Sequence, residues 1–129
     1  MQTRSVAVFP MPWAQPRPSQ RFEGEVFVLV NRHSYSNTVT VAAIVQDFGF
    51  GKVIDEPTAD LASTLSAMER FTLPHTGIDV GYPKARILRP NGGPRPSGVT
   101  PDIMIDMPIV GDIEDTVLQH ALGAIGQRR

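Results

Sequence analysis

The residues with the clearest capacity for chemistry are two serines of a turn, Ser34 and Ser36, which lie between an apolar stretch at residues 26–30 and a helical pattern that starts at Asn37. The N–H groups in the first turn of a helix have no partners inside the helix, and they carry a partial positive charge. They can therefore stabilise the oxyanion that forms when a serine attacks a carbonyl group. The same position also suits a plain helix cap, because a serine oxygen readily accepts a hydrogen bond from one of these N–H groups.

The elements that must position this turn are a strand, a helix and a second strand. Residues 25–31 predict a strand covered on both faces, because its apolar residues are continuous. Residues 37–48 predict a helix with one apolar stripe, and Gly49 follows as a stop signal. Residues 52–54 predict a second strand. This spacing indicates a right-handed βαβ unit with parallel strands, and hence an α/β fold.

The rest of the chain is less strongly patterned. Four prolines within residues 1–24 predict an extended arm, which leaves residues 25–129 as the folded domain. Residues 55–64 predict a polar loop. We expect strands at 69–73, 77–80, 85–88 and 103–107, and a second helix at 112–125.

Composition excludes several classes of function. The chain has 129 residues, a formal net charge of −1 and no cysteine. The charge provides no basic field for nucleic acid or a membrane surface, and no apolar run approaches the roughly 20 residues of a membrane span. Without cysteine there is no disulfide and no thiolate metal site. We expect no cofactor and no metal. The short apolar run at residues 6–9 is a poor signal peptide, because prolines break it at once.

Three stretches, in this order, resemble the S41 peptidases, which are tail-specific or C-terminal-processing proteases. They match the family's strand, serine-rich turn and helix, its strand with a Gly-Glu-x-Thr loop, and its closing Gly-Val-x-Pro-Asp strand; here they are residues 28–49, 53–58 and 98–103. A weaker match to the family's hairpin lies at residues 71–81. The resemblance covers about residues 25–107. It implies a ClpP/crotonase-like core of ββα units, a polypeptide substrate, and an exported or periplasmic location.

The resemblance assigns roles within the serine turn. It implies that Ser36 is the nucleophile of a serine endopeptidase and that the N–H of Asn37 is one oxyanion donor. Ser34 is the alternative nucleophile, and its ordinary role would be hydrogen bonding within the turn.

The general base departs from the family pattern. The family's usual lysine falls on Leu61 here. Glu56 and Lys84 are candidate supporting residues. Asp47 matches a family aspartate, but 11 helical residues place it about 16 Å from Ser36, so we expect a structural role.

The resemblance also implies that the domain is incomplete. Nothing before Glu25 matches the family's upstream glycine-rich turn or its substrate-binding domain. The chain is therefore interpreted as a C-terminal half, paired with a missing N-terminal half or forming a homo-oligomer. One alternative is a non-catalytic remnant or assembly module that pairs through an exposed sheet edge. Another is a crotonase-like enzyme acting on coenzyme A esters, which would explain the fold but not the serine turn.

Overall fold

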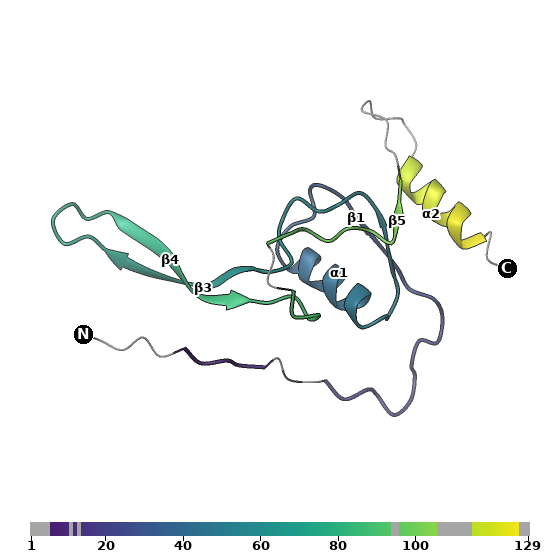
Figure 1. Ribbon diagram of the computed structural model, residues 1–129, viewed down its shortest axis with the longest axis horizontal. Coiled ribbons are helices and arrows are strands. Elements are labelled where there is room, and N and C mark those ends of the chain that lie inside the picture. The colour runs from purple at the N-terminus through teal and green to yellow at the C-terminus, as the bar shows by residue number, and fades with distance from the viewer. Residues whose placement is uncertain (1–5, 11, 13, 94–95, 106–114, 127–129) are drawn as a thin grey trace.

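A computed structural model describes residues 6–10, 12, 14–93, 96–105 and 115–126 (Figure 1). It has a mixed α/β architecture with two small sheets and two helices in the described residues. In chain order the elements are β1 (Phe27–Val30), α1 (Asn37–Asp47), β2 (Lys52–Asp55), β3 (Thr64–Thr72), β4 (Asp79–Ile87), β5 (Ile103–Met104) and α2 (Thr116–Gly126).

The first sheet is parallel, with the strand order β1-β2-β5. The helix α1 connects β1 to β2, so the predicted βαβ unit is present. Small apolar side chains form the core between α1 and the sheet; they are Val30, Val39, Ala42, Ala43, Val53, Ala62 and Val99. This packing fixes where the amino end of α1 lies relative to the strand ends.

The opposite face of the sheet is covered unevenly. Successive strand residues point to opposite faces, so Ile54 points away from its neighbour Val53. Ile54 is fully buried, and α2, which contacts β2, buries Ala121. Leu29 is paired with Ile54 across β1 and β2 but remains 40% exposed. The prediction that β1 is covered on both faces is therefore wrong within the described residues, because β1 is an edge strand and α2 packs on its neighbour β2.

The second sheet is the antiparallel hairpin of β3 and β4, which runs from the pair Thr64–Ile87 to the pair Thr72–Asp79. Ala67 has a φ of 54° and no partner in the register, but the pairs on either side keep the same register, so the ladder is interrupted there without an inserted residue. The sequence predicted three shorter strands here, at 69–73, 77–80 and 85–88. The strand character of these segments is confirmed, but the bounds are wrong, because β3 begins at Thr64 and the last two segments belong to the single strand β4. Most side chains of both strands are exposed, so no buried face imposes an alternating pattern that marks the strand ends.

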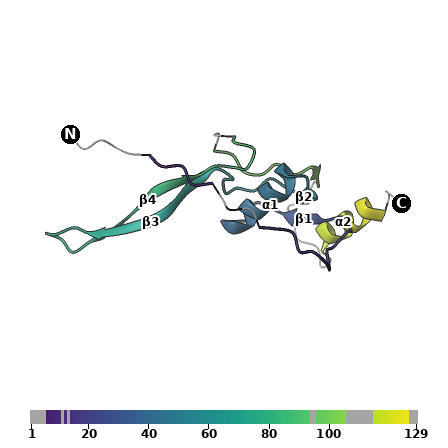
Figure 2. The same cartoon turned by 90° about the horizontal axis from the view of Figure 1, so that it is seen from below.

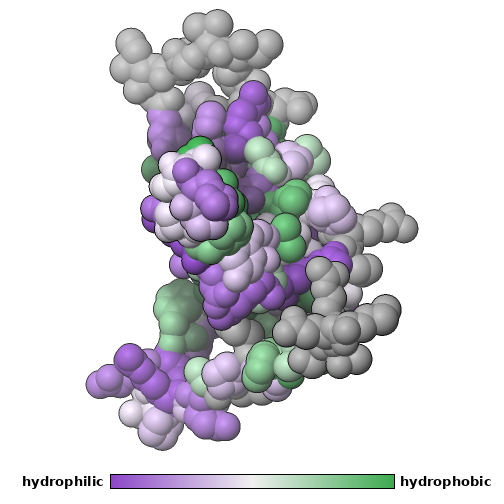
Figure 3. All heavy atoms as spheres, turned by 90° about the vertical axis from the view of Figure 1, so that its left-hand side faces the viewer, coloured by the Kyte–Doolittle hydropathy of each residue, from purple (hydrophilic) through white to green (hydrophobic). Residues whose placement is uncertain are grey.

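The hairpin extends away from the parallel sheet, and α2 lies at the other end of the elongated molecule (Figure 2). Viewed from the hairpin end, hydrophobic side chains are interspersed with hydrophilic ones on the surface (Figure 3). Large exposed apolar residues of the hairpin are Leu65, Met68, Phe71 and Ile78. A two-stranded hairpin is only marginally stable alone in water, so this one depends on its attachment to the core.

The proline-rich arm has neither helix nor strand in its described residues, and its side chains are exposed. The predicted strand at 103–107 begins as β5, and the predicted helix at 112–125 corresponds to α2; residues 106–114 lie outside the described part of the chain. Neither described helix is long and apolar enough to cross a membrane.

Candidate active site

Ser36 occupies a strained position at the amino end of α1. Its φ is 57° and its ψ is −124°, and it is the residue before the first helical residue. A residue with a side chain in such a region is strained by about 1–3 kcal/mol, and such strain clusters at functional sites. Ser36 is exposed, and its side chain makes no capping hydrogen bond. The interpretation of Ser36 as a plain helix cap is therefore wrong.

The backbone N–H groups around Ser36 have distinct partners. The N–H of Ser36 donates to Asp60 Oδ2 at 2.6 Å. The N–H of Thr38 donates to the Tyr35 carbonyl at 3.2 Å, and that of Val39 donates to the Ser36 carbonyl at 3.0 Å. The N–H of Asn37 has no hydrogen-bond partner among the described residues. Asn37 therefore presents an available donor beside the Ser36 hydroxyl group.

Ser34 is used differently. Its hydroxyl oxygen accepts a hydrogen bond from the N–H of Asn31 at 3.0 Å, and its own N–H donates to the Asn31 carbonyl at 2.9 Å. The side chain of Asn31 in turn accepts from the N–H of His33 at 2.9 Å. These bonds close the turn after β1. The hydroxyl of Ser34 is thus committed to the turn, whereas that of Ser36 makes no hydrogen bond with any described residue.

The loop after β2 braces the serine turn at two points. Glu56 Oε2 accepts from Arg32 Nε at 2.8 Å, at the start of the turn. Asp60 accepts from Ser36, at its end. Among the described residues, the Glu56 carboxylate has no hydrogen-bond partner other than Arg32, so the structure shows no base that Glu56 supports. Its ion pair with Arg32 ties the loop to the turn.

Residues of the closing motif hold the same loop. Thr58 Oγ1 donates to the Asp60 carbonyl at 2.9 Å and accepts from the N–H of Val99 at 2.9 Å. A Cβ atom on Gly98 would lie 2.0 Å from the Thr58 carbonyl oxygen, so only glycine fits there. The loop motif at residues 53–58 and the closing motif at residues 98–103 therefore meet at Thr58, which is bonded to Asp60, the partner of Ser36.

Asp55 is a buried carboxylate at the end of β2 that the sequence did not single out. It is 2% exposed, its φ is 103°, and its Oδ1 has no hydrogen-bond partner in the described residues. Burial raises the pKa of this carboxyl, and the charges of Glu56 and Asp115 raise it further. The carboxyl ends of parallel strands share one edge of the sheet, so Asp55 and the serine turn lie at the same edge.

Comparison with known proteins identifies the family. The model of peptidase family S41 matches residues 4–105. The chain belongs to peptidase family S41. This match begins well before residue 25, so it includes most of the proline-rich arm, which lay outside the resemblance at residues 25–107.

A solved structure with a similar fold is the crystal structure of mature CPAF, with a TM-score of 0.53 and 22% sequence identity. The match covers 69% of this chain and 17% of CPAF, so the chain spans about a sixth of that protein's length. At this identity the likeness concerns the fold alone. No curated protein matches the sequence.

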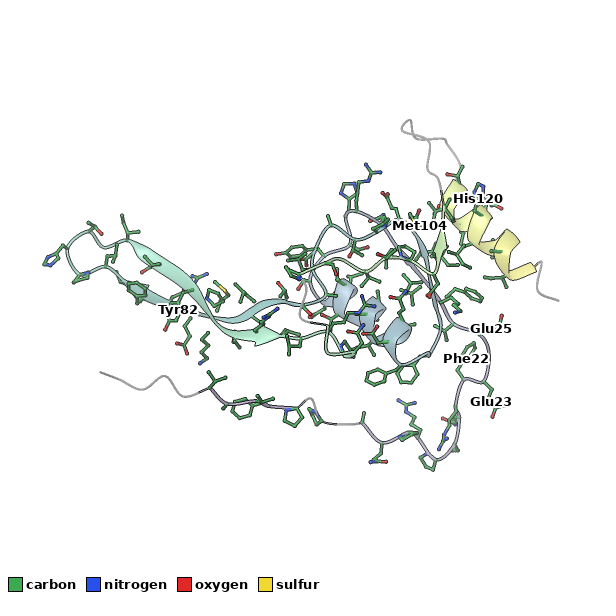
Figure 4. The ribbon with its side chains drawn as sticks, viewed as in Figure 1. Phe22, Glu23, Glu25, Tyr82, Met104 and His120 are labelled. Carbon is green, nitrogen blue, oxygen red and sulfur yellow. The ribbon has the colours of Figure 1, made fainter. Side chains whose placement is uncertain are left out.

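Lys84 does not contact the S41 serine turn in this structure. Its Nζ pairs with Glu69 across the hairpin, and Glu69 also accepts from the Tyr82 hydroxyl at 2.8 Å. Hydrogen bonding to Glu69 raises the pKa of Lys84, whereas a lysine base needs a lowered pKa. Tyr82 lies on the hairpin, away from α1 (Figure 4). The geometry and the charge both oppose Lys84 as the partner of Ser36.

Asp47 lies at the far end of α1, as its sequence position predicted. Its carboxylate accepts hydrogen bonds from Arg89 Nε and Nη2 at 2.8–3.1 Å and from the N–H of Asn91 at 3.1 Å. Burial alone would raise the pKa of Asp47, but Arg89 and Asn91 outweigh it and hold that pKa below its usual value. Asp47 therefore fixes the carboxyl end of the helix and does not contact Ser36.

Proposed function

We propose that this chain is the C-terminal part of a serine endopeptidase catalytic domain, with Ser36 as the nucleophile. The observation that carries the proposal is the exposed, strained Ser36, whose hydroxyl is not used for capping. A strained turn between a strand and a helix is the arrangement that holds a nucleophilic serine oxygen clear of the backbone.

The reaction proceeds through an acyl-enzyme. The Oγ of Ser36 attacks the carbonyl carbon of a peptide bond and gives its proton to a general base. The N–H of Asn37 donates to the oxyanion that develops on the carbonyl oxygen. The carbon–nitrogen bond then breaks, and the leaving amine takes the proton from the base. Water hydrolyses the ester that remains on Ser36 and frees the carboxylate product.

The base and the second oxyanion donor come, in this proposal, from a part of the catalytic domain outside the described residues. Leu61 stands where the S41 pattern has its lysine. We infer a ClpP/crotonase-like core of which this chain forms the C-terminal half. The exposed edge of β1 is the natural place for the other half, or a second copy, to add a strand. The substrate is a polypeptide, and its cleavage is C-terminal processing.

A fluorophosphonate probe tests the proposal, because an activated serine oxygen displaces fluoride from its phosphorus atom. In the assembled catalytic domain, which joins this chain to the part that supplies the base, we expect covalent labelling that Ser36→Ala abolishes. Ser34→Ala is the matched control, since it removes a hydroxyl two residues away that serves the turn. Labelling that survives Ser36→Ala, or a complete lack of labelling of the assembled domain, would contradict the proposal.

The second candidate is a non-catalytic assembly module. It is favoured by the exposed apolar residues of the β3–β4 hairpin and by the open edge of β1. It predicts a concentration-dependent oligomer in sedimentation experiments together with no fluorophosphonate labelling. A monomer that is labelled at Ser36 would exclude it.

A further inference from the structure

We propose that Asp60 is the positioning residue that holds Ser36 in its strained conformation. The inference rests on the proposed role of Ser36. It starts from the bond between the N–H of Ser36 and Asp60 Oδ2, which is 2.6 Å long and joins residues 24 positions apart. A hydrogen bond to a charged acceptor is among the stronger ones in proteins, so it can offset the strain of a positive φ.

Asp60 replaces a capping group that α1 lacks. In a capping box the serine side chain bonds to an N–H of the first turn, and a Glu or Gln at the third helical position bonds back to the N–H of the serine. In α1 that third position is Val39, and the first turn has no acidic residue. Asp60 supplies the bond back to Ser36 from another loop. A carboxylate is also favourable at this end of the helix dipole.

The consequence is that the serine hydroxyl stays free. Because Asp60 satisfies the N–H of Ser36, the residue is fixed by its backbone alone and its Oγ is not drawn into the cap. The same bond commits the N–H of Ser36, so an oxyanion must use the N–H of Asn37.

Asp60 is itself immobilised. Its Oδ1 accepts from the N–H of Leu61 at 2.8 Å, and its carbonyl accepts from Thr58 Oγ1 at 2.9 Å. Thr58 is bonded in turn to the N–H of Val99, a buried residue of the closing motif. The carboxylate therefore reaches Ser36 from a rigid support, which is what a positioning residue requires.

Nuclear magnetic resonance tests the inference without requiring catalysis. In the isotopically labelled chain, a scalar coupling across the hydrogen bond should join the Ser36 amide nitrogen to the Asp60 carboxyl carbon. In Asp60→Ala we expect the Ser36 φ, followed by its backbone couplings, to leave the positive region. Asp60→Asn retains an acceptor oxygen, so we expect it to keep the Ser36 conformation in part. Asp79→Ala is the matched control, because it removes an exposed carboxylate from the distant hairpin.

Fluorophosphonate labelling gives the second readout. We expect Asp60→Ala to slow labelling of Ser36 about tenfold or more, Asp60→Asn to slow it less, and Asp79→Ala to leave it within about twofold. A positive Ser36 φ retained in Asp60→Ala would overturn the inference. If the unaltered assembled domain is not labelled, the proposed function fails, while the Ser36 φ still decides the role of Asp60. If Asp60→Ala does not fold, the coupling in the unaltered chain decides, and its absence overturns the inference.

Discussion

A carboxylate fixes each end of α1, but among the described residues the residue at one end has its side chain hydrogen-bonded and the residue at the other end does not. At the carboxyl end, the side chain of Asp47 is 6% exposed and its two oxygens accept hydrogen bonds from Arg89 and Asn91. At the amino end, Asp60 bonds to Ser36 through the backbone N–H, and the Ser36 hydroxyl is left exposed and without a hydrogen bond to any described residue. The comparison indicates that one end of the helix is built for stability, and the other presents a reactive group at the expense of local strain.

The largest effect should come from breaking the ion pair at the carboxyl end. Arg89→Ala leaves the buried carboxylate of Asp47 without its cation, and we expect a loss of about 3–5 kcal/mol in the free energy of unfolding. Urea denaturation would measure it. Below the denaturation midpoint, labelling of Ser36 should be unchanged. Exposed ion pairs contribute about 0–1 kcal/mol, so a decrease of less than about 1 kcal/mol in the free energy of unfolding would show that the Arg89–Asp47 pair does not stabilise this end.

A smaller effect is expected where the two motifs meet near the amino end. Gly98→Ala places a methyl group against the Thr58 carbonyl, and such overpacking destabilises a protein by about 1–3 kcal/mol. Because Thr58 supports Asp60, this substitution should also slow labelling of Ser36, unlike Arg89→Ala. Equal labelling rates in the two folded variants would remove the distinction between the ends.

The pH dependence of stability should separate Asp55 from Asp47. The pKa of Asp55 is raised by burial, so its contribution to stability is present below the ordinary aspartate pKa and is lost as pH rises through its folded-state pKa. Asp55→Asn should therefore raise the thermal midpoint at pH 7 and change it little in strong acid.

Asp47 should behave in the opposite way. Burial alone would raise the pKa of Asp47, but Arg89 and Asn91 hold it below its usual value. Asp47→Asn should therefore destabilise the chain at pH 7, and this loss should fade as acid protonates the carboxyl group of the unaltered chain. Parallel pH profiles for the two variants would contradict this account.

The smallest effect is expected from the hairpin. Lys84 and Glu69 form an exposed pair, and solvent screens the attraction between such charges, so the pair contributes little to stability. Lys84→Met should leave the urea denaturation midpoint nearly unchanged and leave labelling of Ser36 unaltered. Loss of labelling in a folded Lys84→Met chain would restore this lysine as a candidate base.

The parts that the sequence predicted well are those with a strong hydrophobic period. The unit of β1, α1 and β2 follows from an apolar run, a helical stripe and glycine stops, which are local signals. The hairpin boundaries could not be predicted, because few of its side chains are buried. The position of Ser36 before α1 was predictable, but its positive φ was not, since that depends on Asp60 from another loop. The Asp55 oxygen without a hydrogen-bond partner among the described residues could not be predicted either, because the burial of Asp55 depends on elements distant in sequence.

The site of covalent attachment tests the central claim most directly. Trypsin cuts after Arg32 and Lys52, so a single peptide of residues 33–52 carries both serines of the turn. Tandem mass spectrometry of the assembled catalytic domain, treated with the fluorophosphonate, would locate the phosphonate within this peptide. The account predicts modification of Ser36, whose hydroxyl is free, and none of Ser34, whose hydroxyl closes the turn. A phosphonate on Ser34, or an unmodified peptide, would contradict it.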